Sequence, residues 1–208
     1  MGCYDRFVLP RLIDWAMDNH VVDRQRAKVV VKARGRVLEV GAGSGLNFPF
    51  YDTRVVEQLV ALEPSDELRT KAASRITAGV MDVRFVGGVA ESIPLEDEAV
   101  DTVVLTYTLC SVSDPRAALS EIERVLKPGG SLLFSEHGRA PDPGVRRWQA
   151  RLAPLWKMLA GGCHLDRPIE ELIGGIGFDS TRIESAYLPG FKALHHTTWG
   201  VATKGIRR

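Results

Sequence analysis

Residues 37–45 read Val37-Leu38-Glu39-Val40-Gly41-Ala42-Gly43-Ser44-Gly45, and no other segment of this 208-residue chain is as informative. An apolar strand that carries one acid opens directly into three alternating glycines. Glycine is needed where the backbone turns sharply or where a ligand closely approaches the main chain. In an open α/β sheet, ligands bind beyond the carboxyl ends of the strands. The segment therefore predicts a first strand with a ligand-binding loop, and a turn that only reverses the chain is the alternative.

Apolar runs of strand length alternate with longer amphipathic stretches, which is typical of an α/β fold with a mostly parallel sheet. The predicted strands are residues 36–40, 58–63, 82–86, 100–107, 131–135, 178–187 and 196–203. The predicted helices are residues 66–78 and 114–126, with one or two more within residues 4–33. Asp114 and Pro115 mark the start of the helix at 114–126, and Lys127-Pro128-Gly129-Gly130 is expected to end it.

The composition describes one globular domain and excludes several classes of protein. Lys and Arg number 27 against 26 Asp and Glu, and this net charge of +1 argues against a nucleic-acid-binding protein. Uncharged runs are too short for a transmembrane helix, and Asp5 and Arg6 interrupt any secretory signal. Three widely spaced cysteines, Cys3, Cys110 and Cys163, suit a reducing compartment, so we expect a cytoplasmic protein.

Two acids and one departure from a known fingerprint indicate the ligand of the loop. The dinucleotide pattern G-x-G-x-x-G requires a third glycine at position 46, where this chain has Leu46. Glu39 precedes the loop, where a carboxylate attracts an ammonium group and repels a pyrophosphate. Glu63 lies 22 residues beyond Gly41, close to the spacing of about 20 expected for an acid that binds ribose hydroxyls. The pattern favours a cationic nucleoside, and an NAD-binding oxidoreductase is the weaker alternative.

Three further motifs accompany the glycine loop: Gly88-Val89-Ala90-Glu91-Ser92-Ile93-Pro94, Asp101-Thr102-Val103-Val104 and Leu126-Lys127-Pro128-Gly129-Gly130. Together they resemble the class I S-adenosylmethionine-dependent methyltransferases over nearly the whole chain. The resemblance implies a Rossmann-like three-layer α/β/α sandwich, with a mostly parallel seven-stranded sheet and an antiparallel last strand. It also implies that the methyl donor S-adenosylmethionine, and its product S-adenosylhomocysteine, are bound by Glu39, Gly41, Ala42, Gly43, Ser44, Gly45, Glu63, Pro64, Val89, Ala90, Glu91, Thr106 and Tyr107. Many relatives have Asp in place of Val89, so this chain departs from the family there.

The C-terminal half carries a closer resemblance, in residues 108–113, Glu136-His137 and residues 161–167. These segments resemble a methyltransferase-like branch that includes the animal alkyl-thiol S-methyltransferases, although those proteins begin with a hydrophobic anchor. The resemblance implies in-line methyl transfer to a small, apolar acceptor, with a thiol preferred. The alternative is N-, O- or C-methylation of a lipid, quinone or aromatic metabolite. A non-catalytic cofactor-binding protein is a further alternative.

A base near the acceptor is expected, because a thiol reacts as its thiolate. The candidates are His137, His164 and Asp166, with Glu136 as a further one. For each of them, a hydrogen-bonded structural residue is the alternative.

The cysteines and the remaining histidines are expected to play lesser roles. Cys163 lies beside His164, a pairing that can lower the pKa of a thiol, and Cys110 follows a strand in an uncharged setting. Both are predicted to be structural or to line the pocket, because a direct displacement needs no covalent protein intermediate. His195 and His196 lie on opposite sides of a strand, so no metal site is predicted.

The whole chain is predicted to form one domain: a helical cover at 1–34, a cofactor-binding core at 35–140, a lid-like insert at 141–167 and sheet completion at 168–208. In the insert, apolar residues share one helical face and basic residues fill the rest: Trp148, Leu152, Leu155, Trp156 and Leu159 against Arg146, Arg147, Arg151 and Lys157. The insert is either a helix covering the core edge or a lid over an apolar acceptor, with transient membrane contact as an extension. Tyr4, Phe7 and Trp15 are expected on the opposite wall. A small-molecule acceptor is the expected partner, and the oligomeric state stays open.

Overall fold

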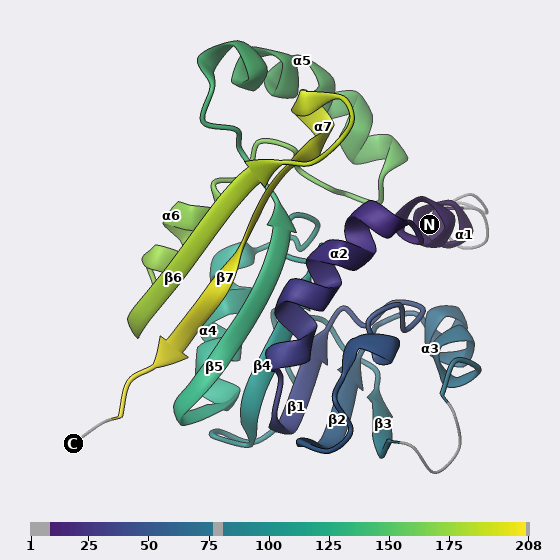
Figure 1. Cartoon of the computed structure of the whole chain (residues 1–208), viewed down its shortest axis with the longest axis vertical. Coiled ribbons are helices and arrows are strands. Elements are labelled where there is room, and N and C mark those ends of the chain that lie inside the picture. Colours follow the sequence, from purple (N-terminus) through teal and green to yellow (C-terminus); the bar gives the residue numbers. More distant parts are fainter. Residues whose placement is uncertain (1–8, 77–80, 207–208) are drawn as a thin grey trace.

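A computed structural model of the chain describes residues 9–76 and 81–206 and shows a single sheet with helices on both faces (Figure 1). Parts of three predictions lie outside these residues. They are the start of the N-terminal helices at residue 4, the end of a helix at residue 78, and the placement of Cys3, Tyr4 and Phe7.

Seven strands form the sheet in the order β3-β2-β1-β4-β5-β7-β6. They are β1 (Gly35–Val40), β2 (Val56–Leu62), β3 (Val83–Val86), β4 (Val100–Thr106), β5 (Leu126–His137), β6 (Phe178–Tyr187) and β7 (His196–Lys204). Strands β1 to β5 are parallel, and β7 is antiparallel to both β5 and β6. The predicted fold class is confirmed, including the antiparallel last strand.

Helices cover both faces of the sheet and its carboxyl edge. Helices α2 (His20–Val29) and α3 (Asp66–Ala73) pack on one face, with α4 (Pro115–Val125) and α6 (Ile169–Gly174) on the other. Three further helices are α1 (Leu9–Met17), α5 (Pro143–Leu159) and α7 (Lys192–His195). Two short 3₁₀ turns lie at Val30–Lys32 and Phe48–Phe50. Within the described ranges, no helix is long and apolar enough to cross a bilayer.

The central strands are buried on both sides, as a parallel sheet between two helical layers requires. Val37 and Val104 pack under α2, whereas Leu38 and Leu105, one residue further along each strand, pack under α4. All four side chains are almost completely buried. This arrangement explains why the strands read as continuous apolar runs rather than as alternating ones.

Helix α4 begins at the predicted cap. The carboxylate of Asp114 accepts hydrogen bonds from the backbone N–H groups of Arg116, at 2.9 Å, and Ala117, at 3.1 Å. Pro115 is the first helical residue, where its missing N–H costs nothing.

The predicted end of this helix is wrong in its details. Helix α4 ends at Val125, and β5 begins immediately at Leu126, so the glycines that were expected to end the helix lie inside the strand. Gly129 has a φ of +77°, and a Cβ on Gly130 would lie 2.8 Å from the carbonyl oxygen of Lys127. The glycine pair therefore permits a tight bend early in β5 instead of separating helix from strand.

Candidate active site

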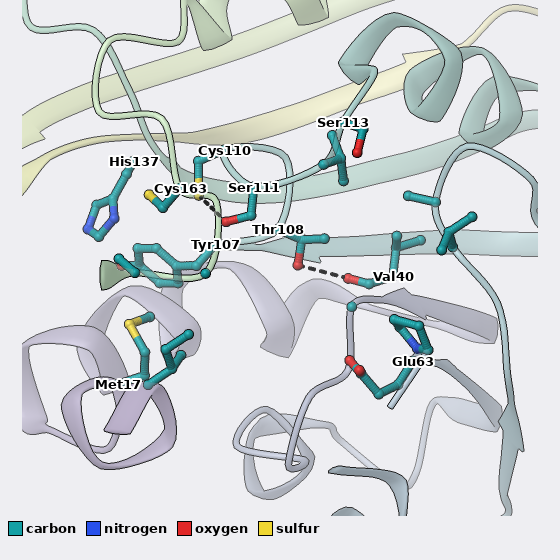
Figure 2. Close-up of a pocket in the computed structure, with 18 of the residues that line it drawn as sticks. Met17, Val40, Glu63, Tyr107, Thr108, Cys110, Ser111, Ser113, His137 and Cys163 are labelled. Carbon is teal, nitrogen blue, oxygen red and sulfur yellow. Dashed lines mark hydrogen bonds between the residues drawn. The ribbon is translucent and has the colours of Figure 1, made fainter. Parts of the chain in front are cut away.

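Two adjoining cavities lie at the carboxyl ends of the parallel strands (Figure 2). The larger cavity has a volume of about 610 Å³ and the smaller one about 220 Å³. Both are lined by Ile13, Met17, Gly41, Tyr107 and Thr108, so they adjoin, and we refer to the two together as the hollow. In Figure 2, Glu63 lies toward one end of the larger cavity, with His137 and Cys163 toward the other.

Most residues that the sequence predicted for the site line this hollow. The larger cavity holds Gly41, Glu63, Pro64, Val89, Ala90, Glu91, Tyr107 and His137. The smaller cavity holds Glu39, Gly41, Ala42, Gly43, Ser44, Thr106 and Tyr107. Four predicted residues are not brought to either cavity: Gly45, Glu136, His164 and Asp166.

The three glycines of the loop have different roles. A Cβ on Gly41 would lie 2.4 Å from Oγ1 of Thr108, and one on Gly45 would lie 2.7 Å from the ring of Phe48, so close packing within the protein requires both glycines. Gly43 has a φ of +55°, but a Cβ added to it would meet no atom closer than a backbone oxygen at 4.0 Å. Gly43 is therefore the glycine that leaves space open toward the cavity.

Glu63 follows β2 and shapes the same loop from the opposite side. One carboxylate oxygen accepts a hydrogen bond from the backbone N–H of Gly43 at 3.0 Å, and the other accepts from that of Ser65 at 2.9 Å. Burial raises the pKa of Glu63 above its usual value, although the two backbone hydrogen bonds and nearby Arg69 oppose this. A carboxylate has about four acceptor positions, so Glu63 keeps capacity for ribose hydroxyls.

Glu39 is more deeply buried than its predicted role requires. Its carboxylate accepts hydrogen bonds from Nδ2 of Asn47, at 2.9 Å, and from the hydroxyl of Tyr51, at 2.8 Å. Burial raises the pKa of Glu39 to about 7, against the lowering effect of these two hydrogen bonds. Asn47 also donates to Oγ1 of Thr106 at 2.8 Å, so Glu39 organises the floor of the smaller cavity through its neighbours.

We expect the variant Glu39→Gln to become more stable relative to the wild type as the pH rises. A raised pKa means that the folded state holds the proton of Glu39 more tightly than the unfolded state does. The stability that this proton gives the wild type is therefore fully present below pH 4.5 and is lost as the pH rises through about 7. Glutamine keeps an acceptor for Asn47 and a donor for Tyr51 without ionising. The difference in unfolding free energy should grow by about 3 kcal/mol between pH 5 and 8. Urea unfolding at both pH values measures this difference, and a constant difference would contradict the expectation.

Arg26 is a buried residue of the smaller cavity that the sequence reading missed. Its Nη1 donates to the carbonyl oxygen of Met17 at 2.8 Å and to the carboxylate of Asp23 at 2.9 Å. Its Nε is also buried but has no hydrogen-bond partner among the described residues. A buried guanidinium N–H without a partner in this cavity is suited to the carboxylate of an incoming ligand.

Asp14 on α1 fastens this helix over the glycine loop, and the sequence reading also missed it. Its carboxylate accepts hydrogen bonds from Ser44 of the loop and from Lys71 and Arg75 of the α3 region. Burial raises the pKa of Asp14, but the hydrogen bonds from Lys71 and Ser44 and the charges of Arg75 and Lys71 outweigh this and lower it overall. Helix α1 is thereby held as one wall of both cavities.

We expect Asp14→Ala to weaken binding of a ligand in the glycine loop by about tenfold, because it removes charge-assisted hydrogen bonds worth about 1.5–3 kcal/mol each in favourable cases. Isothermal titration with S-adenosylmethionine measures the change. Asp18→Ala is the matched control, since Asp18 is an exposed carboxyl one turn further along. An equal effect of both variants would mean that net charge, and not the position of α1, controls binding.

The segment after β3 forms the far wall of the larger cavity. Val89 is half-exposed and Ala90 is buried, and both line the cavity. Glu91 accepts hydrogen bonds from the backbone N–H groups of Ser113, at 2.8 Å, and Asp114, at 3.2 Å. Glu91 therefore ties this segment to the start of α4 in addition to lining the cavity.

Tyr107 directly follows β4 and has a strained backbone conformation. Its φ is +53°, in the left-handed region that non-glycine residues adopt rarely and mostly at functional sites. Its ring makes an edge contact with His137, with 4.8 Å between ring centroids. Burial raises the pKa of Tyr107 to about 12, so its hydroxyl stays protonated.

Glu136 positions the loop after β4 and is not a free base. Its buried carboxylate accepts hydrogen bonds from the backbone N–H groups of Thr108, Leu109 and Cys110 at 2.8, 3.0 and 3.1 Å. Burial raises the pKa of Glu136 to about 7 despite these three donors. Of the two adjacent residues Glu136 and His137, only His137 lines the cavity.

Cys110 and Cys163 meet beside His137 (Figure 2). The loops that carry the two cysteines are joined by a backbone hydrogen bond of 2.8 Å from His164 to the carbonyl oxygen of Cys110. The Cys110 thiol lowers the pKa of Cys163 by donating to it, an effect that burial opposes and His137 reinforces. The same contact, together with burial, raises the pKa of Cys110. Cys163 therefore has the greater thiolate character of the two.

His164 and Asp166 were predicted as candidate bases, but neither residue lines a cavity. Cys163, the neighbour of His164, is buried and lines the larger cavity, whereas His164 lines neither cavity. Asp166 is exposed. Arg167 fixes this segment instead, with a hydrogen bond of 2.8 Å to the carbonyl oxygen of Val112.

The hollow fits S-adenosylmethionine in several respects. Its larger part has a volume within the range of about 300–1,000 Å³ that is usual for small-molecule sites. Gly43 leaves the backbone approachable, Glu63 can accept from hydroxyls, and Arg26 presents a buried donor for a carboxylate. The larger cavity also extends to His137, Cys110 and Cys163.

Comparison with known proteins identifies the family to which this chain is related. Residues 38–134 match the methyltransferase domain family. The human thiol S-methyltransferase TMT1A is 31% identical over 173 residues, which cover 81% of this chain and 70% of that protein. The rat thiol S-methyltransferase TMT1B is 37% identical over 150 residues, 71% of this chain but only 62% of its own length. A phosphatidylethanolamine N-methyltransferase of Cereibacter sphaeroides is 32% identical over 72% of this chain and 73% of its own.

Solved structures share the fold at lower identity. A possible histamine N-methyltransferase from Thermotoga maritima superposes with a TM-score of 0.69 at 22% identity, covering 97% of this chain and 98% of the other. The [4+2]-cyclase SpnF superposes with a TM-score of 0.73 at 22% identity, covering 98% and 95%. At these identities the similarity shows the fold alone, and a cyclase shares it with methyltransferases.

Proposed function

Because this chain belongs to the family of S-adenosylmethionine-dependent methyltransferases, we propose that it transfers a methyl group to a small apolar acceptor, with a thiol preferred. The observation that carries this proposal is one hollow that extends from the glycine loop to the group formed by Cys110, His137 and Cys163. Around the part of the hollow near His137, the walls come from α1 and from the end of α5. Donor and acceptor can therefore lie end to end in the same cavity.

We assign the donor half to residues at the ends of β1 and β2 and to Arg26 of α2. Gly43 lets the main chain approach the ligand, and Glu63 accepts hydrogen bonds from ribose hydroxyls. Arg26 donates from its otherwise unpaired Nε to the carboxylate of the methionine moiety. When bound, S-adenosylmethionine supplies a methyl group activated by a sulfonium, so the protein must mainly align the acceptor and exclude water.

The acceptor half is assigned to His137 and its neighbours. We assign to a ring nitrogen of His137 the proton that a thiol must lose to become a nucleophile. Cys163, whose thiolate character is increased by Cys110, stabilises the resulting imidazolium as an adjacent negative charge. Tyr107 packs edge-on against the imidazole and limits its orientation.

The preference for a thiol rests on the two named thiol S-methyltransferases and on the sulfur-rich end of the cavity. A lipid amine is the second candidate, because the Cereibacter sphaeroides relative is named for phosphatidylethanolamine. A protein that binds the donor without transferring its methyl group is the third candidate. Each of these gives a different result with purified protein.

The test is transfer of labelled methyl from S-adenosylmethionine to a panel of alkyl thiols, phosphatidylethanolamine, quinols and aromatic alcohols, with products identified by mass. Methylated thiol as the main product is the expected result. Product only with an amine or oxygen acceptor would overturn the thiol preference. Tight donor binding without any product would favour the non-catalytic role, and selective binding of NAD would overturn the donor assignment.

A further inference from the structure

Helix α5 exposes its apolar stripe and buries a polar residue. Trp148, Leu155 and Leu159 follow one another at helical spacing and are 52%, 53% and 50% exposed, whereas Gln149 is 1% exposed. Gln149 holds the helix in place by accepting from the backbone N–H of Ala140 at 2.9 Å and donating to the carbonyl oxygen of Gly138 at 3.1 Å. Of the two alternatives for this helix, a cover over the core edge does not account for the exposed part of the stripe.

The exposed apolar surface continues to the entrance of the larger cavity. We define the apolar rim as the exposed apolar residues of α1 and α5, namely Leu12, Ile13, Trp15, Trp148, Leu155, Met158 and Leu159. Leu12 and Ile13 from α1 and Leu159 from α5 also line the cavity. Figure 1 shows the end of α5 approaching α1 beyond the ends of the strands. The rim thus borders the route to the proposed acceptor site.

Unpaired positive charge accompanies the rim. Helix α5 carries Arg146, Arg147, Arg151 and Lys157 and contains no acid. All four side chains are exposed, and none has an ion-pair partner within the described part of the chain. Arg151 lies over the ring of Trp148, with 5.5 Å from the guanidinium carbon to the ring centroid. Positive charge is thereby concentrated on one helix of a chain whose net charge is only +1.

This combination selects one kind of partner. Exposed Trp, Leu and Met beside Arg and Lys are typical of helices that lie in the interface of an anionic membrane. A symmetric contact with a second copy would set four cations against four cations. Nucleic acid would use the cations but leave the apolar rim in water. We propose that the apolar rim and the four basic residues of α5 dock the protein on an anionic lipid surface.

Docking in this way places the cavity entrance against the bilayer. An apolar acceptor could then enter from the lipid without crossing water, a consequence that rests on the proposed methyl transfer. Docking itself requires neither donor nor acceptor. Failure of lipid binding and failure of methyl transfer are therefore separate results.

Vesicle flotation tests the docking, with vesicles of phosphatidylcholine alone or with added phosphatidylserine. We expect the wild type to float with the anionic vesicles and to bind the neutral ones about tenfold or more weakly. High salt should weaken the anionic binding, because the lipid charge is then screened. Equal binding to both kinds of vesicle, or to neither, would overturn the proposal.

Two paired variants test the surface, and neither changes a residue that lines the cavity. Trp148→Ser with Leu155→Ser removes part of the rim, and Arg146→Glu with Arg147→Glu reverses two of the charges. Each pair should reduce binding to anionic vesicles about tenfold or more. Thermal unfolding confirms that the variants are folded.

The matched control is Lys32→Glu with Arg84→Glu, which makes the same change of net charge at exposed positions outside α5. This control should bind anionic vesicles like the wild type. Loss of binding in the control as well, or wild-type binding by both α5 pairs, would overturn the assignment. A dimer in solution that the α5 pairs abolish would instead identify the face as a protein interface.

Discussion

Gly43→Val should reduce the affinity for S-adenosylmethionine about a hundredfold while the protein remains folded. The space beside the Gly43 Cα is open, so the new side chain would occupy the volume through which the donor approaches the main chain. Forcing extra methyl groups into a filled site costs about 1–3 kcal/mol, and each 1.4 kcal/mol is about a factor of ten in affinity. Isothermal titration of the purified variant with the donor measures the change.

A second glycine separates this effect from backbone strain. Gly129 also has a positive φ, of +77°, and a Cβ there meets only Ile206, at 3.7 Å. It lies in β5 and lines neither cavity. Gly129→Val should therefore lower thermal stability as Gly43→Val does but leave donor affinity unchanged. Similar donor affinities in the Gly43 variant and the wild type would remove the glycine loop from the proposed site.

The sheet and the donor half could be predicted because their signals are local. Strand β6 has its predicted bounds, residues 178–187, and Asp114 caps α4 as expected. The glycine loop and Glu63 follow strands whose carboxyl ends must meet at one edge of a parallel sheet. The start of β5 was missed because the signal of residues 127–130 fits a helix stop and a bent strand equally well.

His137 was among the candidate bases and the two cysteines were expected to be structural or to line the pocket, but the grouping of the three residues could not be predicted, because contacts between distant segments build it. Cys110, His137 and Cys163 come from three different segments, and no spacing in the sequence joins them. The motif at 161–167 predicted His164 as a candidate base, but its neighbour Cys163 is the residue that is buried beside the cavity. Asp14 likewise acts on a loop 30 residues away, through a contact that α1 makes only after folding.

The direction of α5 shows a different limit. Periodicity identifies which side chains share a helical face, but it does not say whether that face meets the core or the solvent. Here Gln149, an inconspicuous polar residue, bonds to the chain just after β5 and turns the apolar stripe outward. Only the tertiary structure could reveal this orientation.

His137→Ala should reduce turnover with an alkyl thiol by about 10²–10⁴-fold, the usual contribution of a general base, with donor affinity unchanged. Among the histidines and carboxylates predicted as bases, His137 is the one that lines the cavity, next to Cys163. Removing its imidazole leaves the acceptor proton without a nearby ring nitrogen. Steady-state kinetics at saturating donor, together with donor titration, separate this loss from a binding defect.

Acceptor chemistry distinguishes a base from a structural residue. Thiols of lower pKa are already ionised, so they should lose less rate in His137→Ala than thiols of higher pKa, and added imidazole should restore part of the loss for the latter. His164→Ala is the matched control, since His164 lies in the neighbouring segment but outside the cavity, and it should keep nearly full turnover. A rate loss in His137→Ala that is the same for every thiol and insensitive to imidazole would assign His137 to packing against Tyr107, and the proton to another acceptor.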